Sequence, residues 1–362
     1  LLVGFFLCLS IKSIAVQAQE IDPQYISIVD GLAATTVQDI MQDSYGLLWV
    51  ATTNGLQKYD GYAFQSFKNE PENPNSLLTN NCFALLEDAD HNIWVGTEQG
   101  ISKFDRDKNI FVNYDFNKQF RTTGNASVAL NLFMDRGSRL WAATIGRGIM
   151  RYDPATDQWN PAEYRINDKD GNMPASGLTF SLTEDNNGHL WTSSNTQGLM
   201  MAKNADNPFM PVTIKNENSI DFTTNENGIT DLFADAAGII WIATRNGIYK
   251  YDQQTEILKT IKEYNTAPLN FFNQWNHIGL DQEGNVWISN NFRGVLKFDG
   301  ISDSFQELKI AGSLAMSNIG YDVITTRFTI DKSGIFWFGT INQGLLKYNP
   351  LSKPFKLYEN NP

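Results

Sequence analysis

Few residues in this chain have the types and spacing needed for chemistry. Its 362 residues include three histidines and two cysteines, Cys8 and Cys82. A metal cluster or a nucleophile–histidine pair needs its groups gathered at one point. His91 and His189 instead lie in turns of a repeat, and only His277 lies in a predicted inner strand. No G-x-S-x-G, H-E-x-x-H or Gly-rich phosphate loop occurs. The residues therefore predict no catalytic residues, no metal and no cofactor in this segment.

Carboxylates are plentiful, but most of them belong to the repeat. An Asp stands six residues before a Trp in seven copies, with Trp at positions 49, 94, 141, 191, 241, 287 and 337. Five copies have Gly three residues after the Asp, and D-x-x-G is a turn sequence in which the carboxylate caps free amides. We therefore assign the seven Asp residues to structure. A period of 45 to 50 residues indicates a repeat architecture.

Each copy of the repeat predicts four short strands. The residues around Trp have strand composition, and a second turn ends in Gly before a third strand that closes on K-Y-D or a variant. The fourth copy has Met201-Ala202-Lys203 there, so we expect an irregular outer edge. No segment has a helical period, and four-stranded sheets bury both faces when packed radially. The prediction is an all-β, seven-bladed β-propeller of four-stranded antiparallel blades. Two residues past each Trp the side chain is small, which indicates a close packing contact: Ala51, Gly96, Ala143, Ser193, Ala243, Ser289 and Gly339.

A more informative position lies four residues before each repeat Asp, in the predicted innermost strand. It is mostly polar and is always followed by an apolar residue: Asp39, Ala84, Asn131, Ser181, Asp231, His277 and Arg327. This alternation is expected around an axial channel. Because blades 5, 6, 7 and 1 are contiguous, Asp231, His277, Arg327 and Asp39 could form a charged arc. Two interpretations stay open, an inter-blade hydrogen-bond network and a ligand or coupling site. If the first holds, Asn at positions 39 and 231 leaves the ligand response unchanged.

The loops between the second and third strands share one face with the connections between blades. Their Asn, Gln and Arg residues, with nearby aromatic rings, suit hydroxyl-rich ligands, although polar residues also occupy ordinary exposed turns. The ligand-binding candidates here are Arg147, Arg245, Arg293 and Trp275. A basic residue recurs in the third strand of six copies, and this regularity indicates a feature of the blade and not a site.

Residues 1–18 resemble a secretory signal peptide that ends in Val16-Gln17-Ala18 and lacks its initial Met. Cys82 is then the single cysteine of the mature chain, which excludes an intramolecular disulfide. The formal charge is −12, and becomes −13 without Lys12. This acidity argues against nucleic-acid partners for this segment. We place the propeller at residues 24–359. Tyr25–Ile28 and Pro354–Tyr358 both look like outer strands, so one is surplus, and we expect the front piece of a longer protein.

One stretch carries a family resemblance. GLLWVATTNGLQKYDG (46–61), preceded by VDGLAATTVQDIMQDSYG, resembles the two-component regulator propeller repeat. The resemblance extends over residues 25–359. It implies the N-terminal periplasmic propeller of a hybrid two-component sensor histidine kinase of the Bacteroidetes type, an inner-membrane protein whose downstream domains, including its membrane helix, are absent here. It also implies an oligosaccharide ligand and a homodimer in the full-length protein.

Three functional hypotheses follow. The first is a sensor propeller that contributes to glycan sensing and to transmembrane signalling, without catalysis of its own. The second is an exported propeller-fold enzyme, a lyase or hydrolase acting on glycans, which would need a carboxylate pair or metal site in the channel. The third is a free-standing binding propeller. The downstream reading frame distinguishes them, because only the first requires a membrane span and a kinase.

Overall fold

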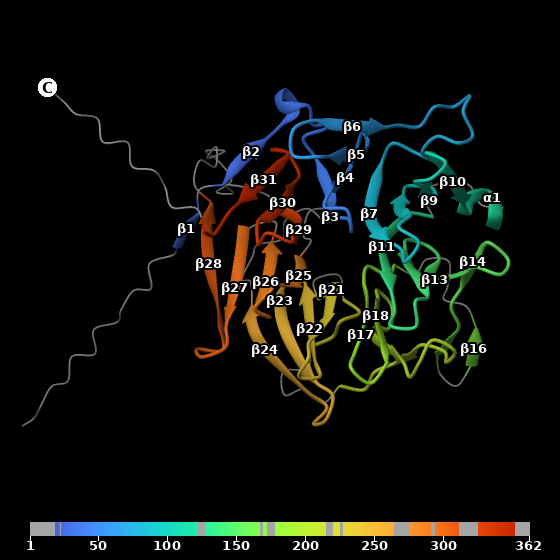
Figure 1. The fold of residues 1–362 in the computed structure, drawn as a ribbon. Helices are drawn as coiled ribbons and strands as arrows, with labels where there is room; N and C mark the ends of the chain where they lie inside the picture. The colour runs from blue at the N-terminus through green and yellow to red at the C-terminus, as the bar shows by residue number, and fades with distance from the viewer. Residues whose placement is uncertain are drawn as a thin grey trace, which may run out of the picture.

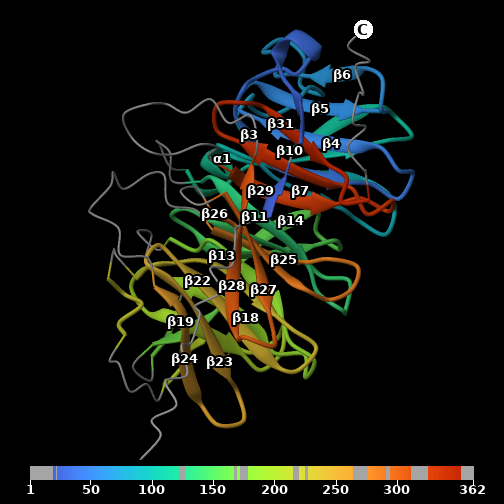
Figure 2. The same cartoon turned by 90° about the vertical axis from the view of Figure 1, so that its left-hand side faces the viewer.

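The structure is a computed structural model that describes residues 19–21, 23–121, 127–166, 169–171, 178–214, 220–224, 227–263, 276–290, 294–310 and 325–351. Seven antiparallel sheets surround an axis, as Figure 1 shows, with the innermost strand of each sheet nearest the centre. Figure 2 shows the same ring after a 90° turn, with β4–β6 at the top and β22–β24 at the bottom. The predicted seven-bladed β-propeller is confirmed. Among the described residues, helix is limited to α1 (Phe116–Phe120) and the 3-10 turn η1 (Ile28–Asp30), and no helix is long and apolar enough to cross a membrane.

The first three blades are regular. Blade 1 contains β3 (Val37–Gln42), β4 (Leu48–Thr52), β5 (Gly55–Tyr59) and β6 (Phe64–Phe67). Blade 2 contains β7 (Cys82–Glu87), β8 (Ile93–Thr97), β9 (Gly100–Asp105) and β10 (Ile110–Asp115). Blade 3 contains β11 (Ala129–Met134), β12 (Leu140–Thr144), β13 (Gly148–Asp153) and β14 (Gln158–Pro161).

Blade 4 has the irregular outer edge that its sequence predicts. It contains β17 (Leu182–Glu184), β18 (Leu190–Ser194), β19 (Gly198–Ala202) and the two-residue β20 (Met210–Pro211). A separate hairpin, β15 (Tyr164–Ile166) and β16 (Lys169–Gly171), precedes it. Blade 5 contains β21 (Ile229–Ala234), β22 (Ile239–Thr244), β23 (Gly247–Asp252) and β24 (Ile257–Glu263). Blade 6 contains β25 (Asn276–Leu280), β26 (Val286–Asn290), β27 (Gly294–Asp299) and β28 (Ser304–Ile310).

The N-terminal segment closes the ring. Blade 7 contains β29 (Thr325–Ile330), β30 (Phe336–Thr340) and β31 (Leu345–Tyr348), and β2 (Gln24–Ile26) pairs antiparallel with β31 as its fourth strand. The preceding β1 (Gln19–Ile21) adds a parallel fifth strand to the edge of blade 6. Of the two alternatives for closure, the structure therefore shows the N-terminal one. Pro354–Tyr358 and residues 1–18 lie outside the described residues.

The Asp–Trp pair of the repeat is a hydrogen-bonded unit in all seven blades. Each Trp Nε1 donates to Oδ2 of the Asp six residues earlier, at 2.7–2.9 Å. The other oxygen, Oδ1, accepts the amide four residues after the Asp, at 2.8–3.1 Å. The carboxylate thus fixes both the turn and the indole. The basic residue opposite Trp holds its charge over the indole ring in six blades, a cation–π contact, whereas Met201 pairs with Trp191 in blade 4.

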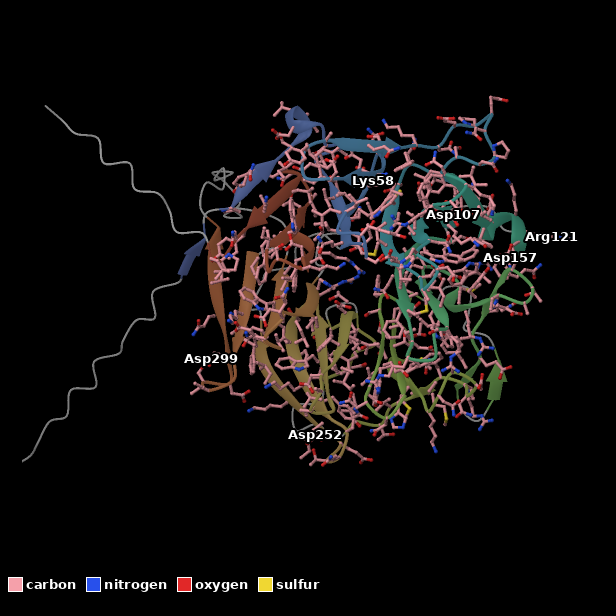
Figure 3. The ribbon with its side chains drawn as sticks, in the orientation of Figure 1. Lys58, Asp107, Arg121, Asp157, Asp252 and Asp299 are labelled. Carbon is pink, nitrogen blue, oxygen red and sulfur yellow. The ribbon has the colours of Figure 1, made fainter. Side chains whose placement is uncertain are left out.

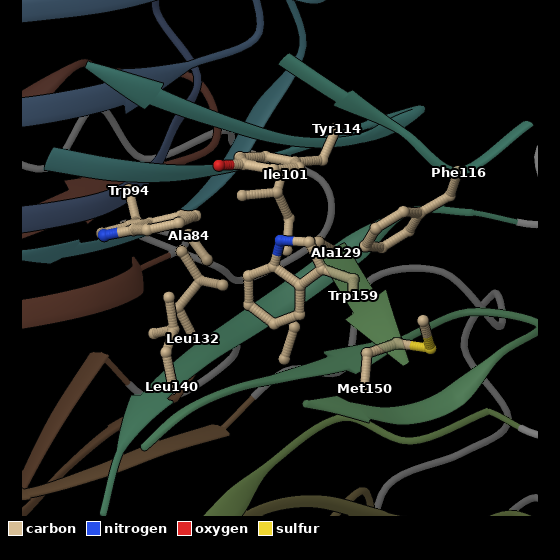
Figure 4. Packing of buried hydrophobic residues seen from close by; sticks show 11 residues of the cluster. Ala84, Trp94, Ile101, Tyr114, Phe116, Ala129, Leu132, Leu140, Met150 and Trp159 are labelled. Atoms are coloured by element: carbon tan, nitrogen blue, oxygen red, sulfur yellow. The ribbon is translucent and has the colours of Figure 1, made fainter. Parts of the chain in front are cut away.

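The hydrophobic core lies between blades. One cluster joins Trp94 of blade 2 to Trp159 of blade 3, whose ring centroids are 5.9 Å apart (Figure 4). The small residues after Trp permit this approach. A Cβ on Gly96 would lie 2.5 Å from the Ala129 carbonyl oxygen of the next blade. The close contact predicted at this position is therefore made by the inner strand of the neighbouring blade.

Candidate functional site at the propeller axis

The axial side chains are positioned by irregular pairing at the start of the inner strands. In β3, the pairing register with β4 shifts between Val37 and Asp39, and β7, β11, β21 and β29 contain the same kind of shift. Such bulges re-aim a side chain. Asp39 and Asp231 each stand opposite a small residue of the second strand, Ala51 and Ala243 respectively. Because inner strands begin where the inter-blade connections end, these side chains lie toward the face that also carries the turns between second and third strands.

Asp231 is the most fully hydrogen-bonded of the axial residues. One oxygen, Oδ1, accepts Ser181 Oγ at 2.5 Å and the Leu232 amide at 2.9 Å. The other, Oδ2, accepts the Ile278 amide at 2.9 Å and lies 2.7 Å from His277 Nδ1. The buried carboxylate of blade 5 thereby joins blades 4 and 6. With Nδ1 directed at Asp231, His277 keeps Nε2 for another partner, and its side chain is 23% exposed.

Asp39 performs a related function in blade 1. Its Oδ2 accepts the Leu85 amide of blade 2 at 2.8 Å, and its Oδ1 lies 2.9 Å from the Ile40 amide. Arg327 of blade 7 approaches the same Oδ2 with Nη1 at 3.9 Å. Two axial carboxylates therefore each accept the amide that follows the axial position of the next blade, which is an inter-blade tie specified by the repeat register.

Arg327 crosses the axis. Its Nη2 donates to the Leu130 carbonyl of blade 3 at 3.2 Å. Asn131 lies beside it, with its amide oxygen 3.3 Å from both Nη1 and Nη2 when the amide is oriented to accept these bonds. One side chain of blade 7 thus contacts blade 1 beside it and blade 3 across the ring.

The two carboxylates titrate in opposite directions. Burial raises the pKa of Asp39 above its usual value, and the Arg327 charge only partly offsets this. Burial acts on Asp231 as well, but the charges of His277 and Arg327 and the hydrogen bonds from His277 and Ser181 outweigh it, so the pKa of Asp231 lies below its usual value. Asp39 therefore takes a proton more readily than Asp231 does.

The structure thus brings Asp39, Asp231, His277 and Arg327 together around the axis, and two of the other four candidates lie in described loops. Arg147 lies in the turn between β12 and β13, where its guanidinium covers the Phe120 ring of α1 at 4.8 Å. Arg245 is half-buried between β22 and β23, and burial lowers its pKa. Arg293 and Trp275 lie outside the described residues. Two further participants are Ser181 and Asn131, which occupy the same repeat position as the four charged residues and could have been selected on that ground.

In the described residues this cluster is a hydrogen-bond network between blades. Its arginine, imidazole and two carboxylates are also groups that can donate to or accept from a polar ligand. Within the part of the chain that the structure describes, no group of three or more His, Cys, Asp and Glu side chains is arranged to hold a metal ion. Cys82 is buried in the core, and burial raises its pKa.

Comparison with known proteins adds the family. The sequence profile described as "Two component regulator propeller" matches residues 31–54 and 76–99, the first two copies of the repeat. These two copies match the two-component regulator propeller repeat. Over 79 residues it is also 38% identical to histidine kinase P4 of Formosa agariphila, and this match covers 21% of the chain and 6% of that kinase.

Solved structures share the fold. The extracellular domain assigned to a hybrid two-component system of B. thetaiotaomicron superposes with a TM-score of 0.70 at 21% identity, covering 91% of this chain and 42% of that one. Virginiamycin B lyase from Staphylococcus aureus superposes with a TM-score of 0.65 at 13% identity, and the match covers 91% of this chain and 99% of the lyase. The surface component PorZ of Porphyromonas gingivalis superposes with a TM-score of 0.62 at 17% identity, and the match covers 88% of this chain and 47% of PorZ. The chain therefore spans less than half of the B. thetaiotaomicron domain, and at these identities the likeness concerns the fold alone.

Proposed function

We propose that this regulator propeller is a periplasmic sensor module of a hybrid two-component system and binds an oligosaccharide at the axial mouth. The single observation that carries the proposal is the position of Arg327, which contacts blades 7, 1 and 3 at once. A ligand that draws the guanidinium toward itself alters these contacts. Binding is thereby coupled to the relation between blades, which is what a sensor module has to transmit.

The rest of the proposed protein lies outside this segment. Histidine kinase activity, the membrane helix and homodimerisation belong to downstream domains, and the signal peptide at residues 1–18 directs export. Support comes from the regulator propeller repeats and from the match to a histidine kinase. In this account the propeller itself converts no substrate, because its axial carboxylates are engaged in ties between blades.

One observation favours a second candidate, a glycan lyase or hydrolase. A carboxylate that holds Nδ1 of an imidazole and leaves Nε2 open is a common general-base arrangement, and Asp231 and His277 adopt it. The enzymatic hypothesis then requires His277 Nε2 to take a proton from bound substrate.

A thermal-shift screen of residues 19–362 against oligosaccharides, with and without EDTA, tests the proposal. A ligand that binds only the native state raises the melting temperature by mass action. We expect stabilisation by one oligosaccharide class, unaffected by EDTA, with the sugar recovered intact by chromatography. Products that disappear in His277→Ala would establish the enzyme instead. A panel with no shift would remove ligand binding from this propeller.

A further inference from the structure

Three departures from the repeat meet on the opposite face, between blades 1 and 2. Two residues after the repeat Asp, the seven copies have Tyr45, Asp90, Gly137, Asn187, Ala237, Glu283 and Ser333, so Tyr45 is the single aromatic residue. At the next position, His91 replaces the Gly found in five copies. The third departure is Arg106, which follows the K-F-D of blade 2. The other copies of the repeat form their blades without these side chains.

His91 is held in a backbone conformation that suits glycine. Its φ is 64°, in the left-handed region, where Gly46 and Gly188 lie in their blades. A side chain costs about 1 kcal/mol or more there relative to glycine. Ser138 holds the same conformation at the equivalent position of blade 3, with a φ of 59°. What distinguishes His91 is therefore its contact with the other two departures.

The three side chains form a clamped platform. The Tyr45 ring has the Arg106 guanidinium 4.9 Å from its centroid on one side, and the His91 ring lies 5.3 Å away at a 60° tilt. Arg106 is itself fixed, because its Nη2 lies 2.7 Å from Asp43 Oδ2 and 3.3 Å from Glu87 Oε1, and its Nε donates to the His91 carbonyl. The Arg106 side chain is only 18% exposed.

The platform nevertheless faces solvent. Tyr45 is 65% exposed, and the His91 side chain is 49% exposed. Ser44 Oγ lies 2.9 Å from His91 Nδ1 and 2.7 Å from Glu87 Oε1, which orients the imidazole. A rigid, exposed tyrosine loses little conformational entropy when it binds a partner.

Charge and size indicate the chemistry of the ligand. Arg106 forms ion pairs with Asp43 and Glu87, and Lys332 donates to the Ser44 carbonyl at 2.7 Å. The turn that carries His91 also contains Asp88 and Asp90, which disfavours an anionic ligand. A flat apolar face with phenol and imidazole groups at its edge therefore suits a neutral polyhydroxylated ring. A stable protein interface needs about 800 Å² per partner, far more than two rings supply.

We infer that Tyr45 and His91 form a second binding site, distinct from the axial one, which stacks one neutral sugar ring on Tyr45. The inference rests on the proposed oligosaccharide-sensing function and adds a sugar contact on the face of the propeller opposite the axial site. Arg106 is a positioning residue, since it acts on the ligand only through Tyr45.

Saturation-transfer NMR with the neutral methyl glycosides of glucose, galactose and mannose tests this site in the whole chain. The variants are Tyr45→Ala, the matched control Tyr62→Ala, which removes a 95% exposed tyrosine of the same blade, and the axial variant Arg327→Met. We expect transfer to at least one glycoside in Arg327→Met, in which the axial site is weakened, a loss of fivefold or more when Tyr45→Ala is added, and no change in Tyr62→Ala.

Equal transfer in Arg327→Met with and without Tyr45→Ala, or no transfer to any glycoside, would overturn the second site. Loss in Arg327→Met alone would also overturn it while leaving the axial proposal in place. If an oligosaccharide still raises the melting temperature of Tyr45→Ala, the axial proposal stands even where the Tyr45 site fails. Capture of a protein through Tyr45, without sugar binding, would mean that the platform is a protein contact and would likewise contradict the inference.

Discussion

Asp39 and Asp231 occupy the same position of the repeat and experience opposite electrostatics. Both are buried and accept two backbone amides. Only Asp231 has an imidazole at hydrogen-bond distance and a hydroxyl on its other oxygen, and the Arg327 charge reaches it as well. The repeat therefore determines where each carboxylate lies, while its neighbours determine its charge.

This difference predicts opposite pH dependences. The lowered pKa of Asp231 gives a stabilisation that is fully present above the unfolded value of about 3.9 and is lost as the pH falls through the folded pKa. Asp231→Asn should therefore cost about 2–4 kcal/mol at pH 7 and less in acid. The raised pKa of Asp39 stabilises the folded state below pH of about 3.9, and this contribution is lost as the pH rises through the folded pKa.

Urea unfolding of both Asn variants across the acid range measures these slopes. At pH 7, Asp39→Asn should lower the free energy of unfolding less than Asp231→Asn does. It should also remove the part of the wild-type decline in stability with rising pH that is due to Asp39. Identical profiles for the two variants would show that the Arg327 and His277 charges do not distinguish the sites.

The repeat Asp makes a further prediction at the residue scale. Asp235→Ala leaves Trp241 Nε1 and the amides of Ala237 and Ile239 without their acceptor, so we expect about 2–4 kcal/mol lower stability. The matched control is Asp299→Ala, which removes an Asp that caps an exposed hairpin, one of the acidic residues at the periphery in Figure 3. Calorimetric melting compares the two. If the melting temperature of Asp299→Ala falls as far as that of Asp235→Ala, the assignment of the repeat Asp–Trp pair to structure is refuted.

At the scale of elements, glycines define where strands approach one another. Gly344 and Gly334 both have φ of 80°, but a Cβ on Gly344 would meet the Ile26 carbonyl oxygen of β2 at 2.4 Å, while one on Gly334 meets nothing within 4 Å. The two alanine variants share the same conformational cost and differ only in the clash with the closing strand. Gly344→Ala should be about 1–3 kcal/mol less stable than Gly334→Ala by urea titration. Equal losses would mean that β2 does not pack on this turn.

The elements were more predictable from the sequence than the site was. Asp–x5–Trp, the small residue after Trp and the Gly of the second turn predict strands, register and blade number, because each is needed by the same local geometry in every copy. The axial position was also readable from this periodicity. The contact of Arg327 across the ring was not predictable, since it joins Arg327 to Leu130 in a blade that is not adjacent. The cluster of Tyr45, His91 and Arg106 was not predictable, because His91 occupies a turn position usually held by Gly and only the fold places Arg106 and Tyr45 beside it.

At the scale of the whole molecule, stability depends on closing the ring. β2 pairs with β31, and β1 extends the edge of blade 6, so the first described residues hold the last blades in place. Removing residues 19–26 exposes the edge of β31, and open edges associate with other chains. We expect light scattering to show self-association of the shortened chain and calorimetry to show a lower, broader transition. A monomer with an unchanged melting temperature would show that closure by β2 is dispensable.

In the proposed function, the propeller binds a sugar at its axis and transmits that event through Arg327. Isothermal titration of wild type and Arg327→Met with the oligosaccharide that stabilises the chain tests it most directly, with the recovered ligand checked by chromatography. We expect intact ligand and an affinity at least tenfold weaker in Arg327→Met. The control Lys68→Met, at the outer edge of blade 1, should bind with the affinity of the wild type. Equal affinity of the wild type and Arg327→Met for the ligand, or cleavage of the ligand, would refute the proposed function.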